Sequence, residues 1–99
     1  SVPKALELAI MSLAGCLGTT FNMTLQKMHL QFKTLEIKAA AKKREEIFLE
    51  SIHINIVNVK SGAEVTKLEC ALTLAEKNCP VDNIFQQTKI PITVELQIS

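Results

Sequence analysis

The sequence predicts a single α+β domain, residues 1–99, in the order helix, strand, strand, helix, strand. One long apolar run predicts the first helix, and the alternation of apolar and polar residues in three later segments predicts strands. Because this alternation gives every strand one apolar face, we expect an antiparallel sheet whose apolar face packs on the helices. A chain of 99 residues buries a thin core and is often completed by a partner subunit.

The first helix is predicted from about Lys4 to Met28, with Pro3 at a position that the first turn of a helix tolerates. The run is apolar enough to raise the question of a membrane span. However, Glu7, Ser12 and several threonines within it are typical of a helix that is buried in protein. We therefore expect a soluble protein with no membrane partner.

Two strands are predicted at residues 32–42 and 47–59, joined as a hairpin by the charged turn Lys43-Arg44-Glu45-Glu46. A second helix to about Asn78 follows Ser61-Gly62-Ala63-Glu64, which has the pattern of a capping box. A short helical turn is expected near residues 83–87, before the last strand. The residues expected to face the core share helical or alternating spacing: Leu35, Ile37, Ala39, Ala41, Ile52, Ile54, Ile56, Val65, Leu68, Leu72, Ala75, Ile90, Ile92, Val94, Leu96 and Ile98.

Composition argues against several classes of function. The 11 basic and 10 acidic residues nearly cancel and Trp and Tyr are absent, so we expect no surface for nucleic acid. Three cysteines without a Cys-x-x-Cys pair do not form a zinc site, and three glycines form no phosphate loop. We therefore expect no metal and no cofactor. An odd cysteine count without a signal peptide favours the reducing cytoplasm.

Cys16 and Cys79 are the candidate reactive groups. A thiolate is a strong nucleophile, and a cysteine oxidised to a sulfenic acid condenses with a second thiol to give a disulfide. The alternative, which composition alone favours, is that Cys16 is a small core residue on an apolar helix. Cys70 projects away from the apolar stripe of its helix, so we interpret it as a peripheral thiol, remote from the other two.

Two segments resemble the redox sites of one family. Ala5–Cys16, reading Ala-Leu-Glu-Leu-Ala-Ile-Met-Ser-Leu-Ala-Gly-Cys, resembles the apolar helix that carries the first redox cysteine of the OsmC/Ohr family. Glu76–Val81, followed by Asp82-Asn83-Ile84-Phe85, resembles the family's second, Cys-Pro-Val site. The family reduces organic hydroperoxides with thiols. The resemblance implies an OsmC-like fold with a long central helix, an intertwined homodimer, and a dithiol as reductant.

The resemblance also implies roles for particular residues. Cys16 corresponds to the cysteine that attacks the peroxide, Cys79 to the resolving cysteine, and Glu7 to the family's glutamate. Glu7 lies nine positions ahead of Cys16, which is about 13 Å along an ideal helix and on its opposite side. We therefore expect no contact between them within one subunit, whereas a contact across a dimer stays open. Alternatively, Glu7 is only a favourable acid near the start of a helix.

The sequence departs from the family in two respects. Residues 1–99 contain no counterpart of the family's N-terminal strands or of the arginine in them that holds the thiolate. Arg44 lies in a charged turn and is not assigned that role. We therefore expect weak activity from the 99 residues alone, because no guanidinium is placed to lower the pKa of Cys16.

Two functions remain open from the sequence. The first is a thiol-dependent peroxidase that reduces organic hydroperoxides through a Cys16–Cys79 pair. The second is a non-catalytic OsmC-like protein that binds a small hydrophobic ligand at the dimer interface, with the cysteines serving only as packing. In the first case we expect an apolar pocket lined by Leu13, Leu17, Phe21 and Phe85.

Overall fold

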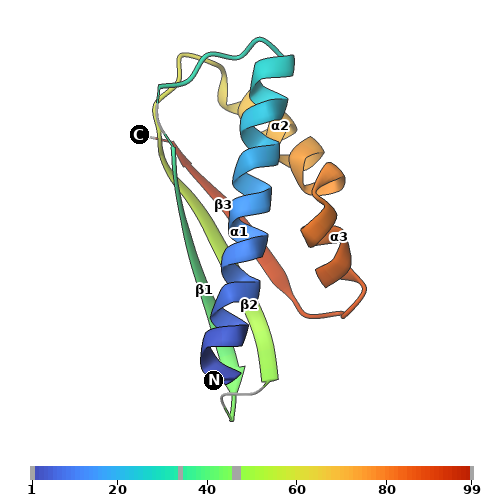
Figure 1. The fold of residues 1–99 in the computed structure, drawn as a ribbon. Coiled ribbons are helices and arrows are strands. Elements are labelled where there is room, and N and C mark those ends of the chain that lie inside the picture. Colours follow the sequence, from blue (N-terminus) through green and yellow to red (C-terminus); the bar gives the residue numbers. More distant parts are fainter. Residues whose placement is uncertain (1, 34, 46–47, 99) are drawn as a thin grey trace.

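The chain folds into one three-stranded sheet with three helices (Figure 1). The structure is a computed structural model and describes residues 2–33, 35–45 and 48–98. The elements are α1 (Val2–Lys27), β1 (Glu36–Arg44), β2 (Phe48–Val59), α2 (Val65–Asn78), α3 (Pro80–Gln86) and β3 (Ile92–Ile98). The predicted order of elements is confirmed, and the short helical turn expected near residues 83–87 is the helix α3.

The sheet has the order β1-β2-β3 and is mixed. Strands β1 and β2 form the predicted antiparallel hairpin, with Ile37 opposite Ile56. Strands β2 and β3 are parallel, with Ile52 opposite Ile92, so the prediction of an antiparallel sheet is wrong for this pair. The physical reason is the connection. Helices α2 and α3 carry the chain back along the sheet, and a parallel pair requires such a crossover.

The core lies between one face of the sheet and the helices. Along α1, Leu13, Leu17, Phe21 and Leu25 recur every four residues and are completely buried. The facing residues of the central strand, Ile52, Ile54 and Ile56, are equally buried. Each such side chain stabilises the fold by roughly 1.5–3 kcal/mol relative to an exposed one. The predicted apolar face of β2 is therefore confirmed.

Helix α1 approaches β1 closely at Gly18. A Cβ atom at this position would collide with the Cδ1 atom of Ile37, so the absence of a side chain lets the strand lie against the helix. Gly15, one turn earlier, has open space around it. The two glycines beside Cys16 therefore have different surroundings.

The start of α2 differs from the prediction. The helix begins at Val65, and its N-cap residue, Glu64, makes no capping bond with its side chain. The Ser61 hydroxyl instead donates a hydrogen bond to the carbonyl oxygen of Gln31 and accepts one from the Ala63 amide at 3.1 Å. The predicted capping box is therefore wrong, because a contact with the segment after α1 occupies this serine.

Other boundaries and faces shift by smaller amounts. Strand β1 begins at Glu36 rather than near residue 32, and His29 in the preceding connection has a positive φ of 58°. On α2, Val65 is exposed, whereas the fully buried Ala71 completes the apolar stripe. The predicted core residues of β3 are only partly covered, and Ile98 is exposed. The predicted turn residue Glu46 and strand residue 47 lie outside the described residues.

The other side of α1 is uncovered. By length and composition alone, Ala5–Lys27 could cross a membrane, although the core helix of a soluble protein passes the same test. One side of the helix fills the core, whereas Leu8 and Met11 on the other side are each 65% exposed. The helix therefore has one packed face and, outside it, large apolar side chains that are mostly exposed.

Candidate thiol site

Two cysteines meet where α1 passes the junction of α2 and α3. The Sγ atoms of Cys16 on α1 and Cys79 at the junction are 3.1 Å apart, and both thiols are free. The Cys79 thiol donates a hydrogen bond to the sulfur of Cys16. An S–S bond is about 2.05 Å long, so a shift of about 1 Å would join the two sulfurs. The fold thus brings the two candidate reactive cysteines together.

Local sequence explains how Cys79 is held. Helix α2 ends at Asn78 and Cys79 adopts an extended conformation, with φ −83° and ψ 114°. A residue before proline is disfavoured in the helical region, and Pro80 then suits the first position of α3. Cys79 thus caps one helix and starts the next. Its sulfur accepts a hydrogen bond from the Asp82 amide at 3.5 Å.

The surroundings of Cys16 favour its thiolate. Partial burial is the largest single effect and raises its pKa, but hydrogen bonds from the Val81 amide, the Cys79 thiol and the Thr20 side chain together outweigh it. The pKa of Cys16 is therefore lowered below its ordinary value of 9.0, even though the charge of Asp82 acts in the opposite direction. Thr20 contributes least of the three, and its hydroxyl donates a hydrogen bond to the Cys16 carbonyl oxygen at 2.8 Å.

The surroundings of Cys79 disfavour its thiolate. The side chain is completely buried, and burial raises its pKa, followed by the hydrogen bond that it donates to Cys16. Amides of Asp82 and Val81 offset part of this effect, and the pKa of Cys79 is about 11. The pKa values of the two contacting thiols are thus shifted in opposite directions, and Cys16 ionises more readily than Cys79.

Two carboxyl groups at the junction of α2 and α3, Asp82 and Glu76, are not among the predicted site residues. Asp82, in the first turn of α3, is only 5% exposed, and burial raises its pKa while a hydrogen bond with the Gln86 side chain lowers it in part. Burial also raises the pKa of Glu76, as does the charge of Asp82. An acid three residues after Cys79 was a visible signal, whereas the Val81 amide belongs to the backbone and has no signature in side-chain identity.

The structure does not bring Glu7 to the thiols. Its carboxylate forms an ion pair with Lys43 at 3.7 Å and is largely exposed. Arg44 lies over the ring of Phe48, 4.8 Å from its centre, and Cys70 is an exposed thiol on α2. Of the three predicted catalytic residues, Cys16 and Cys79 are adjacent and Glu7 is elsewhere in the same chain.

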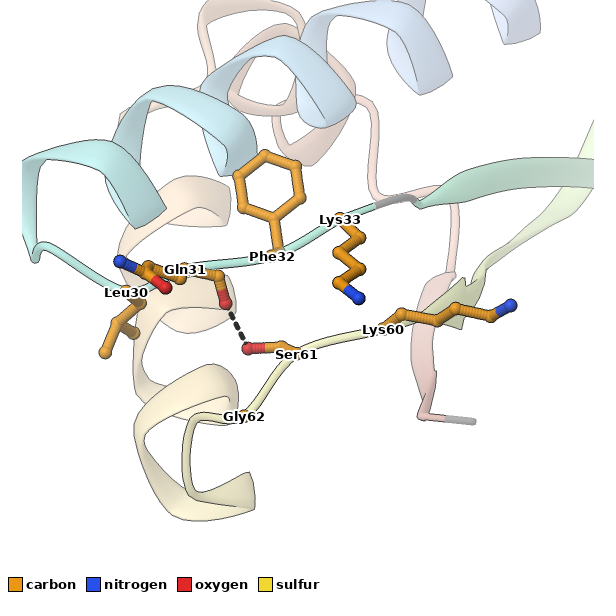
Figure 2. A pocket seen from close by; sticks show the side chains of 7 residues that line it. All are labelled: Leu30, Gln31, Phe32, Lys33, Lys60, Ser61 and Gly62. Carbon is orange, nitrogen blue, oxygen red and sulfur yellow. Dashed lines mark hydrogen bonds between the residues drawn. The ribbon is translucent and has the colours of Figure 1, made fainter.

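Three of the four residues named for the predicted apolar pocket belong to the core, and the fourth, Phe85, is partly buried against it. Leu13, Leu17 and Phe21 are completely buried in the core, because they fill the space between α1 and the sheet. An open groove of about 650 Å³ lies instead between residues 30–33 and 60–62, where Ser61 bonds to Gln31 (Figure 2). Its lining includes neither Cys16 nor Cys79. Within residues 2–33, 35–45 and 48–98, no three His, Cys, Asp or Glu side chains group to hold a metal ion.

The fold and sequence both match a known family. The model of the family described as "OsmC-like protein" matches residues 1–95 of the sequence. The chain belongs to the OsmC-like family. A search among curated proteins found no match.

Solved structures of OsmC-like proteins share the fold. The OsmC-like protein from Mycoplasma pneumoniae has a TM-score of 0.85 at 18% identity, over 94% of this chain and 70% of that one. The organic hydroperoxide resistance protein OsmC from Legionella pneumophila has a TM-score of 0.64 at 14% identity, over 94% and 66% of the two chains. OhrB of Bacillus subtilis, also an organic hydroperoxide resistance protein, has a TM-score of 0.60 at 18% identity, over 93% and 67%.

Proposed function

We propose that this OsmC-like protein is a thiol-dependent peroxidase that reduces organic hydroperoxides through Cys16 and Cys79. The observation that carries the proposal is the 3.1 Å contact between two free thiols whose pKa values are shifted in opposite directions. Two chemically different thiols in contact suit an attacking group and a resolving group. The names of the Legionella and Bacillus proteins support the same substrate class.

The proposed reaction has three balanced steps. The Cys16 thiolate attacks one peroxide oxygen, the O–O bond breaks, and the other oxygen leaves as an alcohol after taking a proton, so that Cys16 becomes a sulfenic acid. The Cys79 sulfur then displaces the sulfenic hydroxyl as water and forms a disulfide. A dithiol reductant finally reduces the disulfide to two thiols and is itself oxidised.

Activation of Cys16 in this proposal does not depend on an arginine of the described chain. The weak activity expected from the sequence rested on the lack of a guanidinium beside the thiol. The Val81 amide and the Cys79 thiol nevertheless lower the pKa of Cys16, although burial opposes them. Thiolates are stabilised by hydrogen-bond donors as well as by cations.

The direct test is consumption of cumene hydroperoxide with dithiothreitol as the reductant. We expect Cys16→Ser to abolish consumption and Cys79→Ser to reduce steady turnover, whereas Cys70→Ser should match the wild type because Cys70 is exposed on α2. Turnover that survives Cys16→Ser would contradict the proposed chemistry. Equal loss in Cys70→Ser would show that the wrong second thiol was chosen. A folded protein that consumes no peroxide would favour the non-catalytic alternative.

We also propose a homodimer that works in the cytoplasm, where its thiols stay reduced. The exposed apolar face of α1, with Leu8 and Met11, lies beside a groove of about 420 Å³ between α1 and β1. Uncovered apolar surface of this kind commonly marks an interface. In this proposal Glu7, on the same part of α1, reaches a thiol site only across the dimer.

The dimer proposal predicts the result of sedimentation. We expect a dimer at micromolar concentration, and we expect Leu8→Glu combined with Met11→Glu to shift the protein to monomers, because two charges would be buried without partners. Glu69→Gln on the exposed side of α2 is a control that should leave the mass unchanged. A stable, compact wild-type monomer would contradict this proposal.

A further inference from the structure

Asp82 is the buried charged side chain among those that the structure describes. Burying a carboxylate costs free energy, and an acid in the first turn of a helix can stabilise it equally well from the surface. The helix α3 alone therefore gives no reason for placing this carboxyl group in the interior. Its neighbours give one.

Asp82 is a neighbour of both cysteines of the thiol pair. Its own amide bonds to the Cys79 sulfur at 3.5 Å, and its charge acts on Cys16 from across the contact with α1. The titratable or charged groups around it are Cys16 from α1, Glu76 from α2 and Cys79 at the junction. Gln86 of α3 adds a hydrogen bond, and Lys77 at the end of α2 is exposed. Asp82 thus lies at the point where the disulfide would form.

Disulfide formation needs an acceptor for one proton. The Cys79 thiol is completely buried, so bulk water does not reach it, and a thiol with a pKa of about 11 carries its proton at neutral pH. A general base acts from within hydrogen-bond reach or through one water. Asp82 is the buried carboxyl residue whose own amide contacts the Cys79 sulfur, at 3.5 Å, and burial makes it a stronger base than an exposed aspartate.

We propose that the Asp82 carboxylate accepts the proton that Cys79 loses when the Cys16–Cys79 disulfide forms. In the peroxidase cycle, on which this inference rests for its physiological meaning, the Cys79 sulfur attacks the sulfur of the Cys16 sulfenic acid. The S–O bond breaks and the S–S bond forms. The Cys79 proton passes to Asp82, which returns it to the departing hydroxide, so that water leaves and the carboxylate is restored.

The same carboxylate has an opposite effect on the first thiol. Its negative charge raises the pKa of Cys16 and so holds back the attacking thiolate. Removing the charge should therefore speed reactions of Cys16 and slow the reaction of Cys79. A residue that only supports the fold would not change the two steps in opposite directions.

Dithiodipyridine separates the two steps without any peroxide. In a Cys70→Ser background, one equivalent reacts with Cys16 and releases the first thiopyridone, and Cys79 then displaces the second from the mixed disulfide. For Asp82→Asn we expect a faster first release at neutral pH and a second release that is slower by at least about tenfold. Asp82→Glu, which keeps a carboxylate, should retain most of the second rate. Glu76→Gln is the matched loss of charge nearby and should change the second rate by less than about threefold.

The wild-type pH profile tests the inference even if Asp82→Asn fails to fold. The second release should slow as the pH falls through the titration of Asp82, at a pKa above that of an ordinary aspartate. A second rate in Asp82→Asn equal to that of the wild type would overturn the proposal, as would a wild-type rate proportional to hydroxide concentration over the whole range. Because no hydroperoxide is used, a lack of peroxidase activity would leave this result unaffected.

Discussion

The two thiols of the site are in contact, yet their surroundings treat them in opposite ways. Cys16 belongs to the unbroken helix α1, is half-buried, and accepts hydrogen bonds from groups outside its own helix. Cys79 occupies the break between α2 and α3, is fully buried, and donates a hydrogen bond to the Cys16 sulfur. In a helix interior the amides are used by the backbone, whereas the first turn of a new helix leaves amides free. The broken helix therefore supplies donors that stabilise the thiolate of its neighbour.

The largest expected effect is a difference in alkylation rate. At pH 7 a thiol with a pKa of about 11 is ionised in about one molecule in 10⁴, and Cys79 is also shielded from reagents. In Cys70→Ser we expect iodoacetamide to modify Cys16 at least about a hundredfold faster than Cys79, as measured by peptide mass spectrometry. Equal rates for the two would remove the asymmetry on which the assignment of roles depends.

A second prediction concerns the free energy of unfolding of the reduced protein at high pH. The pKa of Cys79 rises from 9.0 in the unfolded chain to about 11 in the fold, so the unfolded state loses this proton first. Its stabilising contribution is complete below pH 9 and is lost as the pH rises through 11. The loss should be about 2 to 3 kcal/mol.

Urea unfolding with a phosphine reductant, at several pH values, measures this loss. Cys79→Ala serves as the comparison, because lysines titrate in the same range in both proteins. The free energy of unfolding should fall more steeply with pH in the wild type than in Cys79→Ala, and the difference should account for the loss assigned to Cys79. Parallel stability curves for the wild type and Cys79→Ala would show that the buried thiol titrates normally.

The smallest expected effect lies at Thr20. Its side chain helps to lower the pKa of Cys16, but its proton is already used by the Cys16 carbonyl. Thr20→Val should therefore raise the pKa of Cys16 only slightly, measured from the pH dependence of alkylation. Thr19→Val, at the exposed neighbouring position, is the matched control and should leave the curve in place. A larger shift of the Cys16 pKa in Thr19→Val than in Thr20→Val would show that helix packing, and not the Thr20 side chain, changes this pKa.

Much of the fold could be predicted, because residue spacing determines which face of an element is buried. Ile52, Ile54 and Ile56 follow a period of two and do line the core. The direction of β3 could not be predicted in the same way, since parallel and antiparallel strands show the same alternation. The capping box predicted at Ser61 was wrong for a related reason. Its hydroxyl pairs with Gln31, a partner distant in sequence.

The site could be predicted only in part. Cys16 and Cys79 were identified by their local motifs, and the fold brings them together. The lowered pKa of Cys16 depends on the Val81 amide, which any residue other than proline would supply, so the sequence gives no sign of it. Asp82 was visible as a residue, but its burial depends on how α3 packs against α1 and α2.

The 63-residue separation of the two sulfurs has a consequence for chain entropy. A Cys16–Cys79 disulfide would close a loop of about two thirds of the chain, and restricting the unfolded ensemble to this extent is worth about 4 kcal/mol in the entropic model. The loop contains the whole hairpin and α2, so an oxidised chain would keep α1 tethered to the crossover even when unfolded. Oxidation state and resistance to unfolding are thereby linked. In each turnover the chain would pass from a form whose unfolded ensemble is restricted by the disulfide to a form without this restriction.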